Sequence, residues 1–202
     1  MHFLTDFADL GVLLPLTALV ALSLAFVGLR REALAWTLAV TGTFAAMLVL
    51  KLMVFVVLGS GSIRGLGNPS GHTAAGIVVY AGLATLVARR FASRLAVALF
   101  AGAAFGALFG FSRWALRYHS MADVLVGGAV GMAGVLALAW LAGPRPAEEA
   151  RAGARAGSGG RAGMAVVAAV SLIAVLTLHG TKLHAEAALR SIAAEVRSTV
   201  KG

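Results

Sequence analysis

Residues 33–58 read ALAWTLAVTGTFAAMLVLKLMVFVVL and contain a single charged side chain, Lys51. A helix needs about 20 apolar residues to cross the hydrocarbon core of a bilayer, so this stretch is long enough to do so. Its apolar residues run continuously and do not alternate with polar ones, which excludes a transmembrane β-strand. The segment therefore predicts a membrane-spanning helix.

Further apolar runs of similar character occur on both sides of this segment. Backbone polar groups in lipid are satisfied only inside helices or closed barrels, so each run predicts another helix. The runs extend from Leu10 to Leu29, Gly71 to Ala88, Leu95 to Phe111, Ala122 to Ala142 and, as the shortest, Met164 to Leu178. The sequence thus predicts an all-α, polytopic membrane helical bundle with about six transmembrane helices.

The composition excludes several classes of protein. Hydrophobic residues make up 60% of the 202 residues and charged residues 12%, with a mean hydropathy of +0.92. A soluble domain has about twice that charge, so a soluble enzyme, a disordered chain and a coiled coil are excluded. With no cysteine in the sequence, disulfides, thiolate metal sites and cysteine nucleophiles are excluded as well.

The net charge of +9 comes from 17 Lys+Arg against 8 Asp+Glu. In a membrane protein such a balance fits cytoplasmic loops and anionic headgroups. The basic residues are not interleaved with aromatic residues in a patch, so we expect no nucleic-acid partner. The oligomeric state is not predicted.

The loop charges predict the orientation of the bundle, because cytoplasmic loops carry an excess of Lys and Arg. One side holds nine arginines: Arg30, Arg31, Arg89, Arg90, Arg94, Arg145, Arg151, Arg155 and Arg161. The other side holds three: Arg64, Arg113 and Arg117. We therefore expect the second set and the N-terminus to face outward, in a bacterial inner membrane with this face toward the periplasm. The segment before Leu10 carries Asp6 and Asp9 and no Lys or Arg, so we expect the first span to be a retained helix and not a signal peptide.

Three regions follow from this reading. Residues 1–142 are predicted to form the membrane bundle. Residues 143–163 repeat Arg-Ala-Gly three times and predict a flexible cytoplasmic linker. Residues 164–202 hold the last span and a tail that places apolar residues at helical spacing, with Glu186 and Arg190 one turn apart on the opposite face. This tail predicts an amphipathic helix on the outer interface, with packing or dimerisation as the alternative.

Polar residues gather beside the two outward loops. Between Ala33 and Arg145 the only acidic residue is Asp123 and the only histidines are His72 and His119. Polar groups are expensive near a membrane, so their placement on one side indicates a site. Ser70 can cap the following helix, whose first amides bind anions, and Gly71 lets an anion approach the backbone.

The second outward loop completes a predicted phosphoryl-transfer site. Arg113 offers a planar guanidinium for phosphate oxygens. His119 and Asp123 are four residues apart and share a helix face, where the carboxylate can hold one imidazole nitrogen and leave the other for attack. One histidine can serve as nucleophile while the other protonates the leaving alcohol. The sequence has no cluster of carboxylates for a two-metal site, so we expect metal-independent chemistry and no cofactor.

Two motifs carry a family resemblance. They are Pro-Ser-Gly-His at 69–72 and Ser-Arg at 112–113, followed after five residues by His119 and after three more by Asp123. This pattern resembles the type-2 phosphatidic acid phosphatase superfamily. The resemblance implies a helical bundle with the site at the outer membrane face.

The resemblance also implies roles for single residues. By similarity His119 forms a phosphohistidine, Asp123 orients it and His72 is the general acid. Phosphate binding is implied for three further residues, Arg113, Ser70 and Gly71.

The first motif of that superfamily, Lys, six residues, then Arg-Pro, is altered here. Lys51 is followed at this spacing by Leu58 and Gly59. At 1.5 Å per residue Lys51 lies about 10 Å below the outer end of its span. We expect it to reach the site by snorkelling, with Arg64 supplying the missing guanidinium from the loop.

The sequence thus predicts a lipid-phosphate phosphatase embedded in the bilayer. Its candidate substrates are phosphatidate, phosphatidylglycerophosphate, an isoprenyl phosphate or diphosphate, and a lipid A phosphate. A phosphotransferase uses the same residues and stays open as an alternative. A non-catalytic lipid-phosphate binder or transporter is the other alternative, favoured by the altered first motif. Vanadate-dependent haloperoxidases share the motifs but are soluble, which argues against them.

Overall fold

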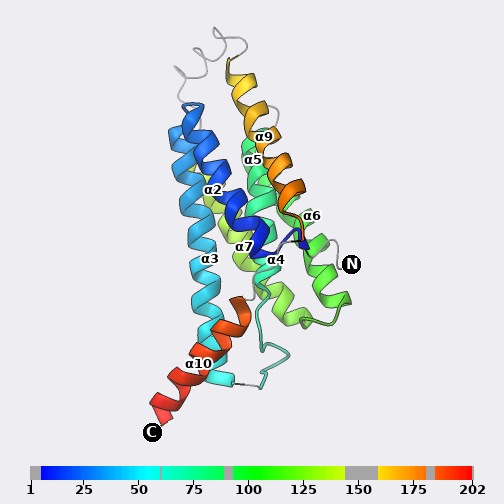
Figure 1. Cartoon of the computed structure of the whole chain (residues 1–202). Helices are drawn as coiled ribbons and strands as arrows, with labels where there is room; N and C mark the ends of the chain where they lie inside the picture. The colour runs from blue at the N-terminus through cyan, green and yellow to red at the C-terminus, as the bar shows by residue number, and fades with distance from the viewer. Residues whose placement is uncertain (1–5, 60, 89–92, 144–158, 181–184, 202) are drawn as a thin grey trace.

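The computed structural model describes residues 6–59, 61–88, 93–143, 159–180 and 185–201, and in these ranges the chain forms helices and no strand. The predicted all-α membrane bundle is thereby confirmed (Figure 1). The helices are α2 (Leu10–Phe26), α3 (Arg30–Leu58), α4 (Gly71–Gly76), the π-helical η1 (Ile77–Ala81), α5 (Gly82–Ala88), α6 (Arg94–Ala115), α7 (Met121–Leu141), α9 (Gly159–Leu178) and α10 (Ala185–Lys201).

Four of the predicted spans are long and apolar enough to cross a membrane within the described ranges. They are α3, the continuous span Gly71–Ala88 made of α4, η1 and α5, then α6 and α7. The first and last predicted spans form shorter apolar helices, Leu10–Phe26 and Gly163–Leu178. The first ends early because Gly28, with φ +81°, turns the chain into α3.

Large apolar side chains on the outside of the bundle mark it as a membrane protein. Phe26 is 92% exposed, and Phe100 and Trp140 are each 80% exposed. In water such a surface would be unfavourable, whereas in a bilayer these side chains contact lipid tails. The interior is closed by a core from α2, α3, the Gly71–Ala88 span, α7 and α9, with Trp36 among its fully buried side chains.

Glycines on α7 bring the Gly71–Ala88 span unusually close. A Cβ on Gly127 would overlap the Ser70 carbonyl, and one on Gly131 would lie 2.7 Å from the Ala74 carbonyl oxygen. A Cβ on Gly134 would overlap Thr43 of α3. The glycine spacing on α7 therefore serves close helix packing, and it sets Ser70 directly against α7.

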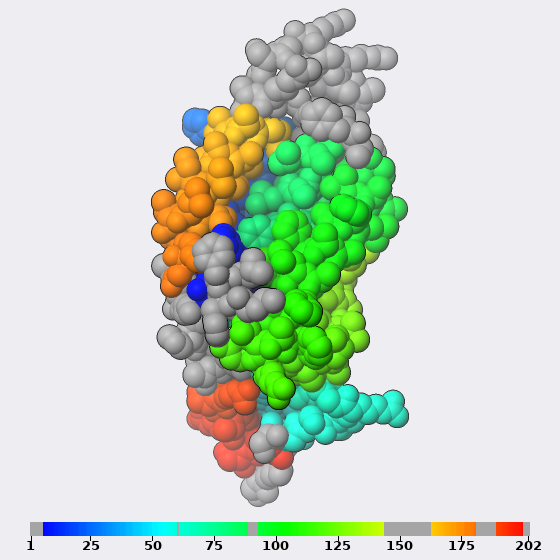
Figure 2. Space-filling view, turned by 90° about the vertical axis from the view of Figure 1, so that its right-hand side faces the viewer, coloured from blue at the N-terminus to red at the C-terminus, as the bar shows by residue number. Residues whose placement is uncertain are grey.

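The C-terminal amphipathic helix is α10, which begins at Ala185 and packs against α3 (Figure 1). Figure 2 shows α10 in red beside the cyan loop that follows α3, at the lower end of the molecule. Ala193 is buried in this contact, while Ile192 and Val196 are exposed. Of the predicted linker, residues 144–158 lie outside the described residues, whereas residues 159–163 are helical and form the start of α9, so the linker was predicted too long at this end. The side chain of Glu186 also lies outside the described residues.

The close packing of α7 predicts the effect of two alanine substitutions. Gly131→Ala should lower the thermal midpoint of the purified protein, because the methyl group meets backbone of α4 and overpacking costs about 1–3 kcal/mol. Gly128→Ala is the matched control, since a Cβ there has no neighbour within 4 Å. A helical Gly-to-Ala change by itself favours the helix, so the control should keep or raise the midpoint. Equal midpoints for both variants would contradict this packing.

Candidate active site

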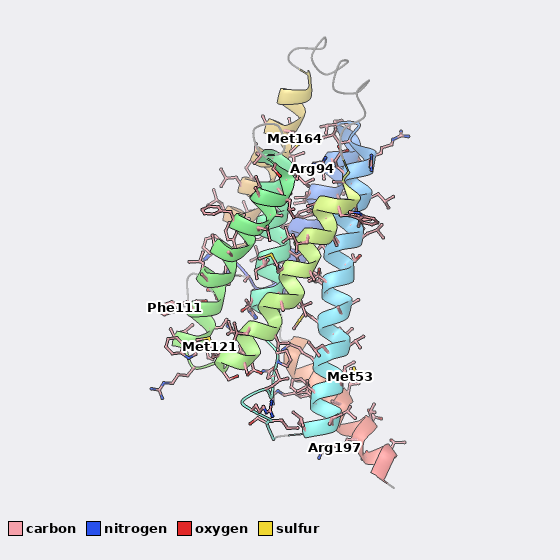
Figure 3. The ribbon with its side chains drawn as sticks, turned by 180° about the vertical axis from the view of Figure 1, so that it is seen from behind. Met53, Arg94, Phe111, Met121, Met164 and Arg197 are labelled. Carbon is pink, nitrogen blue, oxygen red and sulfur yellow. The ribbon has the colours of Figure 1, made fainter. Side chains whose placement is uncertain are left out.

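Both sequence motifs lie at the same end of the bundle. The loop between α3 and α4 and the loop between α6 and α7 meet there. Figure 3 shows Met53 of α3, Phe111 of α6 and Met121 of α7 at this end. The first of these loops is joined directly to the start of α7, because the Ser70 N–H donates to the Asp123 backbone carbonyl at 3.0 Å.

The Asp123 carboxylate organises this end. Its Oδ1 accepts the N–H groups of Gly67 at 3.1 Å and Asn68 at 2.9 Å, and its Oδ2 accepts the Ser120 N–H at 3.1 Å. The Ser120 hydroxyl in turn accepts the Asp123 N–H, which completes a capping box at the start of α7. One buried side chain thus caps a helix and holds the neighbouring loop.

His119 is held by the backbone of that loop. Its Nδ1 lies 2.8 Å from the Asn68 carbonyl oxygen, and the residue is 6% exposed. A carbonyl only accepts, so Nδ1 carries the proton that it donates. In the neutral ring the unprotonated nitrogen is then Nε2.

The expected direct contact between Asp123 and an imidazole nitrogen is therefore corrected. Asp123 is the third residue of α7, and its carboxylate turns back to cap the helix and bind the loop. It is linked to His119 indirectly through Asn68, whose N–H donates to Asp123 and whose carbonyl lies against His119.

Lys51 of α3 contacts the loop between α3 and α4. Its Nζ donates to Asn68 Oδ1 at 2.7 Å, although the residue is 7% exposed and stands two turns from the end of α3. Its Cε would lie 3.4 Å from a Cβ on Gly71. The ammonium thus lies beside the first residue of α4, as snorkelling predicts.

Ser70 is fully buried at the N-cap of α4. Its Oγ accepts the Thr73 N–H at 3.4 Å and lies 2.9 Å from Thr73 Oγ1. Ser70 therefore fixes the direction in which the first amides of the span point.

His72 and Arg113 lie in the same region. His72 Nε2 lies 3.7 Å from Asp9 Oδ2, at the N-cap of α2. Both Arg113 and Lys51 lie near enough to interact electrostatically with His72. The Arg113 guanidinium stacks 4.6 Å from the centre of the Tyr118 ring, which restricts its plane.

Arg64 does not join these residues. It lies at the tip of an exposed turn closed by two hydrogen bonds between Ile63 and Leu66, with φ +51°. Its side chain lines an outer groove with Met53 and Val57 of α3 and Ala122 of α7. The structure thus brings together His119, His72, Asp123, Arg113, Ser70, Gly71 and Lys51. Arg64 is not among them, because it is exposed on its turn and lines a separate groove.

Two residues at this site, and the arginines of α10 beside it, were missed by the sequence interpretation. Asn68 has no motif of its own, and its role depends on where its backbone lies. Asp9 is far from the motifs in the sequence. The one pattern that could have indicated it is its position directly before an apolar helix, where an acidic residue is typical of an N-cap. Arginines of α10 also approach this end, since Arg190 stacks on Phe55, one turn beyond Lys51.

An apolar groove adjoins the site. It has a volume of about 510 Å³ and runs between α6, α7 and the Gly71–Ala88 span, from Thr73 and Val124 to Met132. Glycines form much of its wall, among them Gly106, Gly110 and Gly128. Within the described ranges, no three or more His, Cys, Asp or Glu residues lie together as metal ligands would.

Comparison with known proteins identifies the class. The family model of the PAP2 superfamily matches residues 51–146, which include both motifs, Lys51 and the whole of α7. The match agrees with the resemblance that the two motifs carry, and this resemblance is confirmed. No curated protein and no solved structure matches the chain. The protein is thus an integral membrane protein with a phosphatase-type domain.

The positions of Lys51 and Arg64 predict different effects on anion binding. Lys51→Met should weaken the binding of orthophosphate to the purified protein by about tenfold or more, because an ionic hydrogen-bond donor is lost. Arg64→Gln, which removes an exposed charge at the turn, should change the dissociation constant by less than about twofold. Isothermal titration calorimetry in detergent measures both. A larger loss in the Arg64 variant would contradict the placement of the two cations.

Proposed function

We propose that the protein hydrolyses a phosphomonoester or diphosphate of a membrane lipid through a phosphohistidine at His119. The observation that carries this proposal is the hydrogen bond from His119 Nδ1 to the Asn68 carbonyl. It leaves the Nε2 lone pair for attack, in a region that also holds Lys51 and Arg113.

The charged phosphoryl group is bound by fixed donors. The Lys51 ammonium and the Arg113 guanidinium neutralise its oxygens. The backbone N–H groups of Gly71 and His72, at the start of a span that continues to Ala88, add hydrogen bonds. Such preset donors stabilise the charge that spreads over the equatorial oxygens in the transition state.

The proton transfers are assigned to His72. Nε2 of His119 attacks phosphorus, the bond to the lipid oxygen breaks, and protonated His72 gives its proton to that oxygen. Water then attacks the phosphohistidine and gives a proton to His72, which releases orthophosphate and restores both histidines. The Asp9 carboxylate, 3.7 Å away, stabilises the protonated imidazole of His72.

The groove between α6 and α7 supports a lipid as the substrate. It is lined by apolar side chains and begins at Thr73, which directly follows His72 and lies three residues after Ser70. A headgroup phosphate at His119 therefore leaves its tail beside an apolar surface that faces the bilayer. By the loop charges this site faces outward, toward the periplasm of a bacterial inner membrane. The chemistry proposed for these residues requires no metal ion.

Phosphate release from a panel of lipid phosphates tests this function. The purified protein, in EDTA, should release orthophosphate from at least one member of a panel of phosphatidate, phosphatidylglycerophosphate and isoprenyl diphosphate. His119→Ala should lower the rate by about 1,000-fold or more, since the nucleophile is lost.

The control is the affinity of the same variant for orthophosphate, which should change little because the cationic donors remain. An alanine variant that turns over at the wild-type rate would refute the phosphohistidine. Transfer of the phosphoryl group to an added alcohol, without release to water, would assign the site to a phosphotransferase.

A further inference from the structure

The outer end of α3 is covered by α10 and contributes two residues to a small pocket. The pocket has a volume of about 270 Å³ and is lined by Phe55, Gly59, Arg190, Ala193, Ala194 and Arg197. Figure 3 shows Arg197 near the end of α3, beyond Met53. Two guanidinium groups from one face of α10 thus converge on the end of a transmembrane helix.

Each of the two arginines has defined contacts. The Arg190 guanidinium lies 4.9 Å from the centre of the Phe55 ring, in a cation–π arrangement. Arg197 lies directly against Gly59, where a Cβ would overlap its guanidinium. Gly59 ends α3 with φ +61°, a conformation that glycine adopts without strain. The glycine therefore both ends the helix and makes room for Arg197.

The chemistry of the pocket is that of an anion site. Guanidinium groups bind phosphate oxygens through paired N–H donors. The volume is below that of pockets for complete drug-sized ligands, but suits one headgroup substituent.

The pocket and the candidate active site share one neighbouring side chain, the ring of Phe55. Lys51 Nζ lies 5.8 Å from the centre of the Phe55 ring on which Arg190 stacks. The same Nζ donates to Asn68, whose carbonyl holds His119. Phe55 is buried, and its ring lies close to both cations. The pocket therefore adjoins a cation of the candidate active site, on the side of α3.

We propose that this pocket is a subsite for a second phosphate of the substrate headgroup. The inference rests on the proposed function and narrows its substrate to lipids that carry a phosphodiester in addition to the terminal phosphomonoester. The monoester lies at His119, and the phosphodiester, one short polyol away, lies between Arg190 and Arg197.

Substrate selectivity tests the subsite. The wild type and the variants Arg190→Gln and Arg197→Gln are compared on phosphatidylglycerophosphate, which has two phosphates, and phosphatidate, which has one. Each variant should lower the ratio of kcat/KM for the first lipid over the second by about tenfold, chiefly through KM. Arg30→Gln, an exposed arginine at the opposite end of α3, should leave the ratio unchanged.

A binding measurement separates the subsite from the catalytic proposal. In the His119→Ala background, Arg197→Gln should weaken the binding of phosphatidylglycerophosphate about tenfold more than that of phosphatidate. Selective binding without turnover in the His119-intact protein would support the subsite while refuting the phosphatase. Turnover of both lipids with an unchanged ratio in both arginine variants would refute the subsite while leaving the phosphatase standing.

A bulk bilayer lipid is the rival occupant of the pocket. The measurements are therefore repeated in neutral detergent and in vesicles with increasing phosphatidylglycerol content. The proposal predicts the same selectivity loss in both media. A loss that appears only in vesicles and grows with their anionic fraction would overturn the proposal, because the pocket would then bind surrounding lipid.

Discussion

The Asp123 carboxylate accepts backbone N–H groups from Gly67, Asn68 and Ser120 and so joins two loops at one end of the bundle. A charged acceptor buried with three donors is strongly favoured, and each lost bond would leave a buried donor unsatisfied. Because Asn68 is fixed in this way, its carbonyl meets His119 and its side chain meets Lys51. The charge of one residue in the first turn of α7 thus positions His119, the proposed nucleophile, and the cation of Lys51, which lie on different elements.

Close packing of the helices allows these residues to come together. Gly127 and Gly131 remove the side chains that would separate α7 from the Gly71–Ala88 span, so Ser70 and Asp123 come within backbone hydrogen-bonding distance. At the other flank α10 closes over the end of α3 and places Arg190 against Phe55. Residues from both ends of the chain, Asp9 and Arg190, thereby approach a region otherwise formed by the central helices.

The helices and the motif residues could be predicted from the sequence. The length of an apolar run and the clustering of polar residues are properties of a single segment and need no knowledge of how segments pack. The positions of His119, His72 and Ser70 follow from motifs at the starts and ends of spans. The contact between His119 and Asn68 could not be predicted, since it depends on a backbone carbonyl in a loop without regular structure. Arg64 was expected at the site from its place in that loop, yet the direction of a short turn is not encoded in hydropathy. The position of α10 depends on tertiary packing across more than half of the chain.

The tautomer of His119 tests the role of Asp123 without relying on turnover. In protein labelled with ¹⁵N at histidine, comparison with His119→Ala identifies the signals of this ring by NMR spectroscopy. At a pH where His119 is neutral, we expect the proton on Nδ1 in the wild type. In Asp123→Asn, whose amide offers one acceptor oxygen and places a donor against the loop, we expect both tautomers. A proton on Nε2 in the wild type, or an unchanged tautomer in Asp123→Asn, would contradict the proposed coupling of Asp123 to the nucleophile.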